Sequence, residues 1–242
     1  MTKSAKITLI ILVVCIAVCI AGGIVLSAAD VGFEAVILAV PAAVLFLQTK
    51  KADKNGAKVT WGNPVGALII AAFTLLLTFG TPPFINSRMK WQYPIQQKYI
   101  SRFHNVKAPE YFPTSLEEVL GDYEFGYMPS IMQGTGYFSV TYKTTPERAA
   151  ACAAEYAPQA KYTIPLKEYI EMGGYKVEDF TPRENSCDDG TLDVYISGKM
   201  REGGSESAQI YVLYAVLNWN HPHSTAVIVD TETGLVQFSQ LG

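Results

Sequence analysis

The sequence predicts a membrane protein: three N-terminal transmembrane helices followed by an extracytoplasmic α+β domain with an antiparallel sheet. Two observations predict this fold class. Of the 242 residues, 49% are hydrophobic and only 17% are charged, whereas soluble domains carry about 25% charged residues. The charges are also uneven, because residues 1–84 hold nine of them and residues 85–242 hold the other 32 and all 14 tyrosines. This composition excludes a uniform soluble domain, a disordered chain and a nucleic-acid binder with a basic face.

Residues 1–85 are the predicted transmembrane region, with helices at about 7–29, 33–48 and 64–85. The first run has 23 uncharged residues, enough to cross a hydrocarbon core of about 30 Å. A cleaved signal peptide is the alternative, although its apolar core usually has about 7–15 residues. The second run follows a polar break at Asp30-Val31-Gly32, is short and contains Pro41, so its alternative is a re-entrant or interfacial segment.

Lysines predict the orientation of these helices. Short cytoplasmic segments accumulate Lys and Arg. Lys3 and Lys6 precede the first helix, and the loop between the second and third helices holds Lys50, Lys51, Lys54 and Lys58. The N-terminus and this loop are therefore predicted to be cytoplasmic, and residues 86–242 to lie outside. Trp61 and Trp91 bracket the third helix, as aromatic residues at a membrane interface do.

Small residues recur at every fourth position of the first two helices. They are Cys15, Cys19, Gly23 and Ser27 in the first, and Ala35, Ala39 and Ala43 in the second. Such stripes allow close helix packing and predict a hairpin of the two helices, with an oligomer seam as the alternative. No ionisable residue lies deep in a span, which argues against a transporter or a channel.

A connector, residues 86–110, leads into the outer domain, residues 111–242. Its polarity pattern predicts a helix at 95–103. Within the outer domain we expect a short helix at 115–120 from a capping-box pattern, a β-hairpin of 123–132 and 137–142, and helices at 146–156 and 166–172. The helix at 146–156 has five alanines and a proline in its first turn, both of which favour helix.

The C-terminal part is predicted to be a β-meander. Apolar and polar residues alternate over 192–196, the pattern of a half-buried strand. Further strands are expected at 210–219, 225–229 and 235–238, joined by turns rich in Gly, Asn and Pro. We expect three or four antiparallel strands to pack against the alanine-rich helix.

The end of this meander, VIVDTETGLVQF at 227–238, is similar to the closing hairpin of small extracytoplasmic modules of the PepSY kind. The resemblance covers twelve residues. Asp-x-x-Thr-Gly is also a generic hairpin turn, so the resemblance implies no function here.

Cys152 and Cys187 are the two cysteines of the outer domain, and an oxidising compartment favours a disulfide between them. The alternative, a nucleophilic cysteine, lacks support because neither has the electropositive surroundings that activate a thiol.

No catalytic residue and no cofactor is predicted. His221, His223 and His104 are the weak candidates for a metal site, but Asn220-His221-Pro222-His223 also reads as an exposed turn. The sequence contains no phosphate-binding loop, no Gly-x-Ser-x-Gly elbow and no His-Glu-x-x-His motif.

The expected partners are the lipid bilayer and, through a tyrosine-rich outer surface, a protein, peptide or envelope component. No nucleic acid is expected. Tyrosine suits contact surfaces because it joins an apolar face to a polar tip; the alternative places these tyrosines in the core. They are Tyr93, Tyr99, Tyr111, Tyr123, Tyr127, Tyr137 and Tyr142.

The sequence thus favours a membrane-anchored, non-catalytic binding or assembly module. The alternatives are a membrane-anchored hydrolase that uses the three histidines, and a small subunit of a transport or secretion complex.

Overall fold

The computed structural model describes residues 3–55, 62–80, 83–104, 110–117, 119–131, 134–178, 180–182, 184 and 186–242. The chain divides into two compact units. The helical unit comprises residues 1–85 and 98–106, and the sheet unit comprises residues 86–97 and 107–242.

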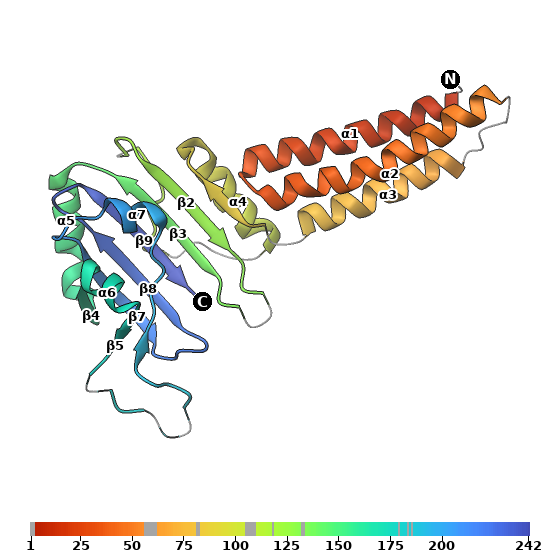
Figure 1. The fold of residues 1–242 in the computed structure, drawn as a ribbon. Helices are drawn as coiled ribbons and strands as arrows, with labels where there is room; N and C mark the ends of the chain where they lie inside the picture. Colours follow the sequence, from red (N-terminus) through yellow and green to blue (C-terminus); the bar gives the residue numbers. More distant parts are fainter. Residues whose placement is uncertain are drawn as a thin grey trace. The chain divides into compact units, whose positions relative to one another are not determined.

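Three helices run side by side in the helical unit (Figure 1): α1 (Lys3–Leu26), α2 (Ala29–Lys54) and α3 (Gly62–Gly80). Within the described residues, one segment, Lys6–Leu26 of α1, is long and apolar enough to cross a membrane. Shorter apolar stretches occur in α2 and α3, at Leu38–Gln48 and Val65–Gly80. Three transmembrane spans therefore remain a prediction.

The turn between α1 and α2 lies earlier than expected. Ser27 has a φ of 51°, and its N–H binds the Ile24 carbonyl at 3.3 Å. A left-handed residue at this position ends a helix. The expected break at residues 30–32 is wrong, because these residues belong to α2.

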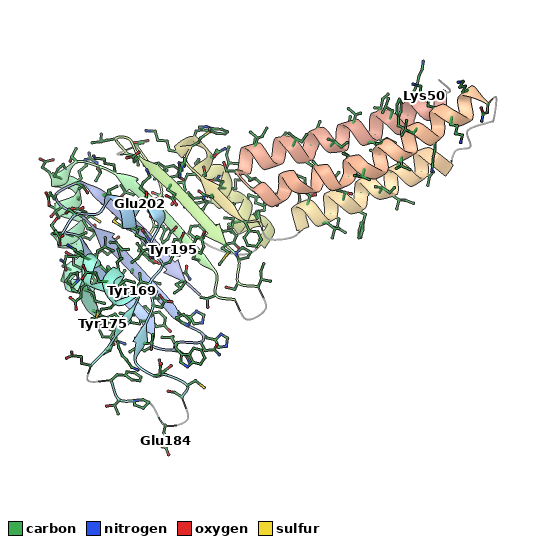
Figure 2. The ribbon with its side chains drawn as sticks, viewed as in Figure 1. Lys50, Tyr169, Tyr175, Glu184, Tyr195 and Glu202 are labelled. Carbon is green, nitrogen blue, oxygen red and sulfur yellow. The ribbon has the colours of Figure 1, made fainter. Side chains whose placement is uncertain are left out.

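The lysine-rich segment is also more helical than expected. Helix α2 continues through Lys50 and Lys51 and ends at Lys54, so the first three of the four lysines do not lie in a loop. Lys50 lies near the end of α2 in Figure 2. Cations in the last turn favour helix because they interact well with the helix dipole. Lys58 and Trp61 lie outside the described residues.

Small side chains fill the core between the three helices. Cys15 and Cys19 are buried there as predicted, and their thiols lie 3.7 Å from the Ala71 carbonyl and 3.8 Å from the Thr78 hydroxyl. The stripe predicted on α2 is only partly right, because Ala39 and Ala43 are exposed. The buried residues of the core are Leu12, Cys15, Cys19, Ala35, Leu38, Ala42, Ala67 and Ala71.

The sheet unit is an antiparallel-sheet and helix α+β structure, as predicted. Its sheet has seven strands in the order β1-β2-β3-β9-β8-β7-β4, so three or four was too few. The predicted hairpin (β2–β3) and the predicted meander (β7–β8–β9) form one sheet because β3 pairs with β9. The strands are β1 (Ile85–Ser87), β2 (Tyr123–Met128), β3 (Tyr137–Lys143), β4 (Tyr162–Pro165), β7 (Gln209–Val216), β8 (His223–Val229) and β9 (Leu235–Leu241).

Helices cover both faces of the sheet. Val140, Phe238 and Val227 are register partners and share one face with Phe125 and Phe138. We call this the aromatic face, and it carries α5 (Pro146–Tyr156). The other, aliphatic face packs Ile210, Ile228 and Leu235 against α6 (Leu166–Met172) and α7 (Gly198–Gly203). Both helices lie over the sheet in Figure 1.

Two local predictions fail and three hold. The predicted helix at 115–120 is not formed among its described residues; instead the Leu120 N–H binds the Lys143 carbonyl at 2.9 Å. The strand predicted at 192–196 is reduced to β6 (Thr191–Leu192), which pairs with β5 (Tyr175–Lys176).

Helices α5 and α6 match their predicted ranges, and α4 (Tyr93–His104) contains the predicted connector helix. Two 3-10 turns complete the chain, η1 (Lys90–Gln92) and η2 (Ala157–Gln159).

Asp230 connects the β8–β9 turn by hydrogen bonds to the chain that follows α7. Its fully buried carboxylate accepts hydrogen bonds from the N–H and hydroxyl groups of Ser205 and Thr233, with further bonds from Ser207 and Glu232. Gly234 follows with a φ of 76°, and a Cβ there would lie 2.2 Å from the Thr144 carbonyl. The Asp-x-x-Thr-Gly segment therefore closes a hairpin, as its sequence predicted.

Candidate functional site

Helix α5 supplies one wall of the candidate site. Thr145 caps it, its hydroxyl accepting from the Arg148 N–H at 3.3 Å, and Pro146 occupies the first turn. Ala149 and Tyr156 are buried against the sheet. Arg148, Cys152 and Glu155 are spaced four and three residues apart, so they follow one another along one side of the helix.

A cavity of about 510 Å³ lies between this side of α5, the aromatic face and residues 110–114. We call it the α5 pocket. It falls within the usual size range of small-ligand pockets, about 300–1,000 Å³. Its lining residues are Glu110, Tyr111, Phe112, Pro113, Thr114, Tyr142, Thr144, Arg148, Ala151, Cys152, Glu155, Tyr156, Val236 and Phe238.

The floor of the α5 pocket is aromatic. The Phe238 ring is stacked with the Tyr142 ring at 6.3 Å between centroids and meets the Tyr156 ring edge-on at 5.8 Å. Tyr111 is fixed by a 2.7 Å hydrogen bond from its hydroxyl to the Ser239 carbonyl. Such contacts hold the rings in defined positions, so the floor is a rigid apolar surface.

The rim of the pocket is charged. Glu110, Arg148 and Glu155 are all exposed, which places two carboxylates and one guanidinium around the aromatic floor. Burial raises the pKa of the Tyr142 phenol above its ordinary value, and the neighbouring Cys152 and Tyr156 raise it further. The phenol is therefore neutral at physiological pH. The pocket offers an apolar base and a polar edge of mixed charge.

Cys152 lines the pocket as a thiol. Burial and the nearby Glu155 raise its pKa to about 12, so it stays protonated at neutral pH. Because the thiolate is the nucleophilic form, this cysteine is a packing residue of the pocket wall.

The structure does not contain the predicted disulfide, since Cys152 and Cys187 are both free. Cys187 lies in the loop that joins β5 to β6, whose Asp189 N–H binds the Leu217 carbonyl at 2.8 Å. Glu184 marks the outer part of this loop in Figure 2. The prediction rested on compartment and on cysteine number, and neither says which segments lie close together in space.

Two of the three candidate histidines lie in and after one turn of the sheet unit. His221 and His223 are exposed in and after the β7–β8 turn, which Asn218 shapes by accepting from the N–H groups of Asn220 and His221 at 2.8 and 3.2 Å. The side chain of His104 lies outside the described residues. Among the side chains that the structure places, no three His, Cys, Asp or Glu could hold a metal ion together.

Several of the tyrosines expected at a contact surface belong to the core. Tyr93, Tyr123 and Tyr127 are buried, and Tyr137 stacks on Tyr195 at 3.7 Å between ring centroids. Tyr111 and Tyr142 line the α5 pocket, and the Tyr99 hydroxyl donates to the Phe79 carbonyl at 3.2 Å. Trp91, by contrast, is 55% exposed.

A second cavity of about 510 Å³ lies between α6 and the chain after α7. Lys167 and Glu206 cross its mouth as an ion pair, and Glu171, Arg201 and Glu232 also line it. No aromatic residue lines this cavity among those that the structure describes. The α5 pocket is therefore the stronger candidate.

Sequence reasoning missed the α5 pocket. Helical spacing could have grouped Arg148, Cys152 and Glu155 on one side of α5. Nothing in the sequence places residues 110–114 beside them, because that contact depends on the order of the strands. The chain matches no protein-family model, no curated protein and no solved structure.

Proposed function

We propose that the protein is a membrane-anchored, non-catalytic binding module that holds a peptide segment in the α5 pocket. The pocket itself is the observation that supports this proposal. Its aromatic floor suits an apolar side chain, and aromatic anchors dominate many protein contacts. Tyr142 and Cys152 are both neutral there, which suits binding better than nucleophilic chemistry.

The charged rim supports a peptide as the ligand. Arg148 suits a carboxylate, because guanidinium groups bind carboxylates in a bidentate manner. Glu110 and Glu155 suit ammonium or guanidinium groups. A polypeptide carries apolar side chains and both signs of charge within a few residues, so it matches the floor and the rim together.

The helical unit supports membrane anchoring through its pattern of burial. Small and polar side chains, such as Ala67, Cys19 and Thr78, are buried, whereas Phe73 is 61% and Leu76 is 68% exposed. A water-soluble helix bundle would bury its large apolar residues. Small residues at the helix contacts and large apolar residues outside are the arrangement expected in lipid. We propose that α1, α2 and α3 all cross the bilayer.

We also propose the multi-pass topology that the lysines indicate. The N-terminus and the end of α2 would be cytoplasmic, and the sheet unit would lie outside. Lys50, Lys51 and Lys54 support this placement, because cytoplasmic segments are rich in lysine.

Photo-crosslinking from inside the pocket tests the binding function. Ala151 is exposed and lines the pocket, while Ala150 is also exposed but does not line it. A photoreactive amino acid at position 151 of the full chain, irradiated in the native membrane, should give a discrete protease-sensitive adduct. The same amino acid at position 150 should not. Equal adducts from both positions, or none from position 151, would contradict the proposal.

Charge reversal provides a second arm of this experiment. Arg148→Glu and Glu155→Lys should each lower the yield of the adduct from position 151, because each reverses one charge of the rim. Lys176→Glu is a matched control on an exposed lysine of β5 outside the pocket. If the control lowers the yield as much as the rim variants do, the rim does not select the ligand.

A further inference from the structure

The segment that begins the sheet unit presents apolar side chains to solvent. Met89 and Trp91 are each 55% exposed and Ile95 is 42% exposed. Single exposed apolar residues are ordinary, but a group within seven consecutive residues marks an interaction surface. These three residues lie on and around η1 and in the first turn of α4.

The same segment is basic. Arg88 and Lys90 are exposed beside these apolar residues. Residues 86–97, which begin the sheet unit, contain two cations and no Asp or Glu, although residues 85–242 as a whole have six more acids than bases. The local charge is therefore opposite to that of the domain to which the segment belongs.

Buried neighbours fix this segment to the sheet. Tyr93 is 1% exposed, meets the Phe125 ring edge-on at 5.4 Å, and donates its hydroxyl to the Pro113 carbonyl at 3.0 Å. Gln92 is also buried, and its side chain accepts from the Ser87 hydroxyl. The buried side chains of Gln92 and Tyr93 anchor the segment to the sheet. Met89, Trp91 and Ile95 remain exposed to solvent.

We propose that Arg88, Met89, Lys90, Trp91 and Ile95 form a lipid-contact patch that binds anionic headgroups of the membrane. Tryptophan concentrates at the headgroup level because its ring is amphipathic. Basic residues near an anionic surface each strengthen binding by roughly fivefold. The patch would hold the sheet unit against the bilayer.

The short connection between α3 and Arg88 supports lipid as the ligand of the patch. Arg88 follows Gly80, the last residue of α3, by eight residues, so it can lie at most about 28 Å from the end of that helix. This step rests on the proposed membrane anchoring of α3. A surface that is both basic and apolar, and that is tethered within this distance of a transmembrane helix, can reach the headgroups.

Quenching of Trp91 by brominated lipid tests the patch. The full chain with Trp61→Phe and Trp219→Phe, reconstituted into vesicles, retains Trp91 as its one tryptophan. Its emission should be quenched by brominated phosphatidylcholine, and more strongly when phosphatidylglycerol is included. A chain that retains only Trp219 is the control, because that residue is 70% exposed but follows β7, near the opposite edge of the sheet from β1.

Charge reversal distinguishes the headgroup contact from simple proximity. Arg88→Glu should remove most of the additional quenching seen with phosphatidylglycerol, a loss of more than fivefold in surface binding. Lys161→Glu makes the same charge change next to β4 and should leave the quenching unchanged.

Three negative results would each overturn a different part of the proposal. A chain that carbonate washing extracts from the vesicles would overturn the membrane anchoring itself. A chain that resists extraction but shows no Trp91 quenching would overturn the patch alone. Equal quenching with and without phosphatidylglycerol would overturn the binding of anionic headgroups.

Discussion

Two neighbouring tyrosines show how a single hydroxyl group affects stability. Tyr93 and Tyr123 are both buried, and their ring centroids lie 6.2 Å apart. The Tyr93 hydroxyl donates to the Pro113 carbonyl, whereas the buried Tyr123 hydroxyl has no hydrogen-bond partner among the groups that the structure places. A buried polar group without a partner costs about 1–3 kcal/mol.

Tyr123→Phe should therefore raise the free energy of unfolding by about 1–3 kcal/mol, because it removes a buried hydroxyl that is desolvated and forms no compensating hydrogen bond. Tyr93→Phe is the matched variant and should lower it by about 1 kcal/mol, because it removes a hydrogen bond. Denaturant unfolding of the detergent-solubilised chain, followed by near-UV circular dichroism, measures both. Destabilisation of equal size in the two variants would contradict this difference.

The Asp230 carboxylate links stability to pH. Burial raises the pKa of this carboxyl, but the hydrogen bonds from Ser205 and Thr233 outweigh burial and bring the pKa to about 2, below its ordinary value of 3.8. A lowered folded-state pKa contributes stability that is fully present above pH 3.8 and is lost as the pH falls through 2.

Asp230→Asn should therefore destabilise the sheet unit by about 2 kcal/mol at neutral pH and much less at pH 2. Thermal unfolding of both proteins between pH 7 and pH 2 measures the difference. Glu232→Gln, in the same turn, is the control. A difference between wild type and Asp230→Asn that stays constant down to pH 2 would show that the carboxylate charge is not involved.

At the scale of elements, the two units build their cores in opposite ways. The sheet unit buries large residues such as Phe125, Ile210 and Ile228 between strands and helices. The helical unit buries mainly alanines and cysteines, with Leu12 and Leu38, and exposes many of its large apolar side chains. The first pattern follows from the hydrophobic effect in water. The second follows from close helix contact where the surroundings are themselves apolar.

Adjacent alanines of α3 test this arrangement. Ala71 is buried and its carbonyl lies against the Cys15 thiol, whereas Ala72 is exposed. Ala71→Leu should cost about 1–3 kcal/mol, because a larger side chain overfills a close helix contact. Ala72→Leu should be tolerated in the membrane. Thermal unfolding of the two variants in lipid nanodiscs, followed by circular dichroism, measures this, and equal destabilisation would mean that the helices pack differently.

At the scale of the whole molecule, the proposed topology places the sheet unit outside the membrane and the end of α2 in the cytoplasm. The lysines near the end of α2 predict a cytoplasmic location for that end. Residues 86–107 carry five cations of their own, so the charge count is close on the two sides of α3. A direct measurement decides the orientation.

Cysteine labelling provides that measurement. Cys187 is exposed and free, so it reports on the sheet unit, and Lys54→Cys in a chain that also carries Cys187→Ser reports on the end of α2. In a Cys152→Ser background, a membrane-impermeant maleimide should label Cys187 in intact cells. It should label position 54 only after lysis. The reverse pattern would overturn the proposed topology.

Local sequence was sufficient wherever a short-range rule determined the structure. Pro146, the alanines and Thr145 determined α5, Gly173 with a φ of 67° ended α6, and Asp230 to Gly234 closed the β8–β9 hairpin. The composition of residues 1–85 likewise determined three apolar helices. In each case the decisive interaction lies within one helix or one turn.

Only the tertiary structure decided which segments, distant in the sequence, contact one another. Leu120 binds the Lys143 carbonyl in place of a helix, and pairing of β3 with β9 joined the predicted hairpin to the meander. It also brought residues 110–114 to α5, which created the pocket. These contacts join residues far apart in the chain, and no local propensity or spacing encodes them. The sequence by itself determined the elements, and long-range strand pairing decided the site.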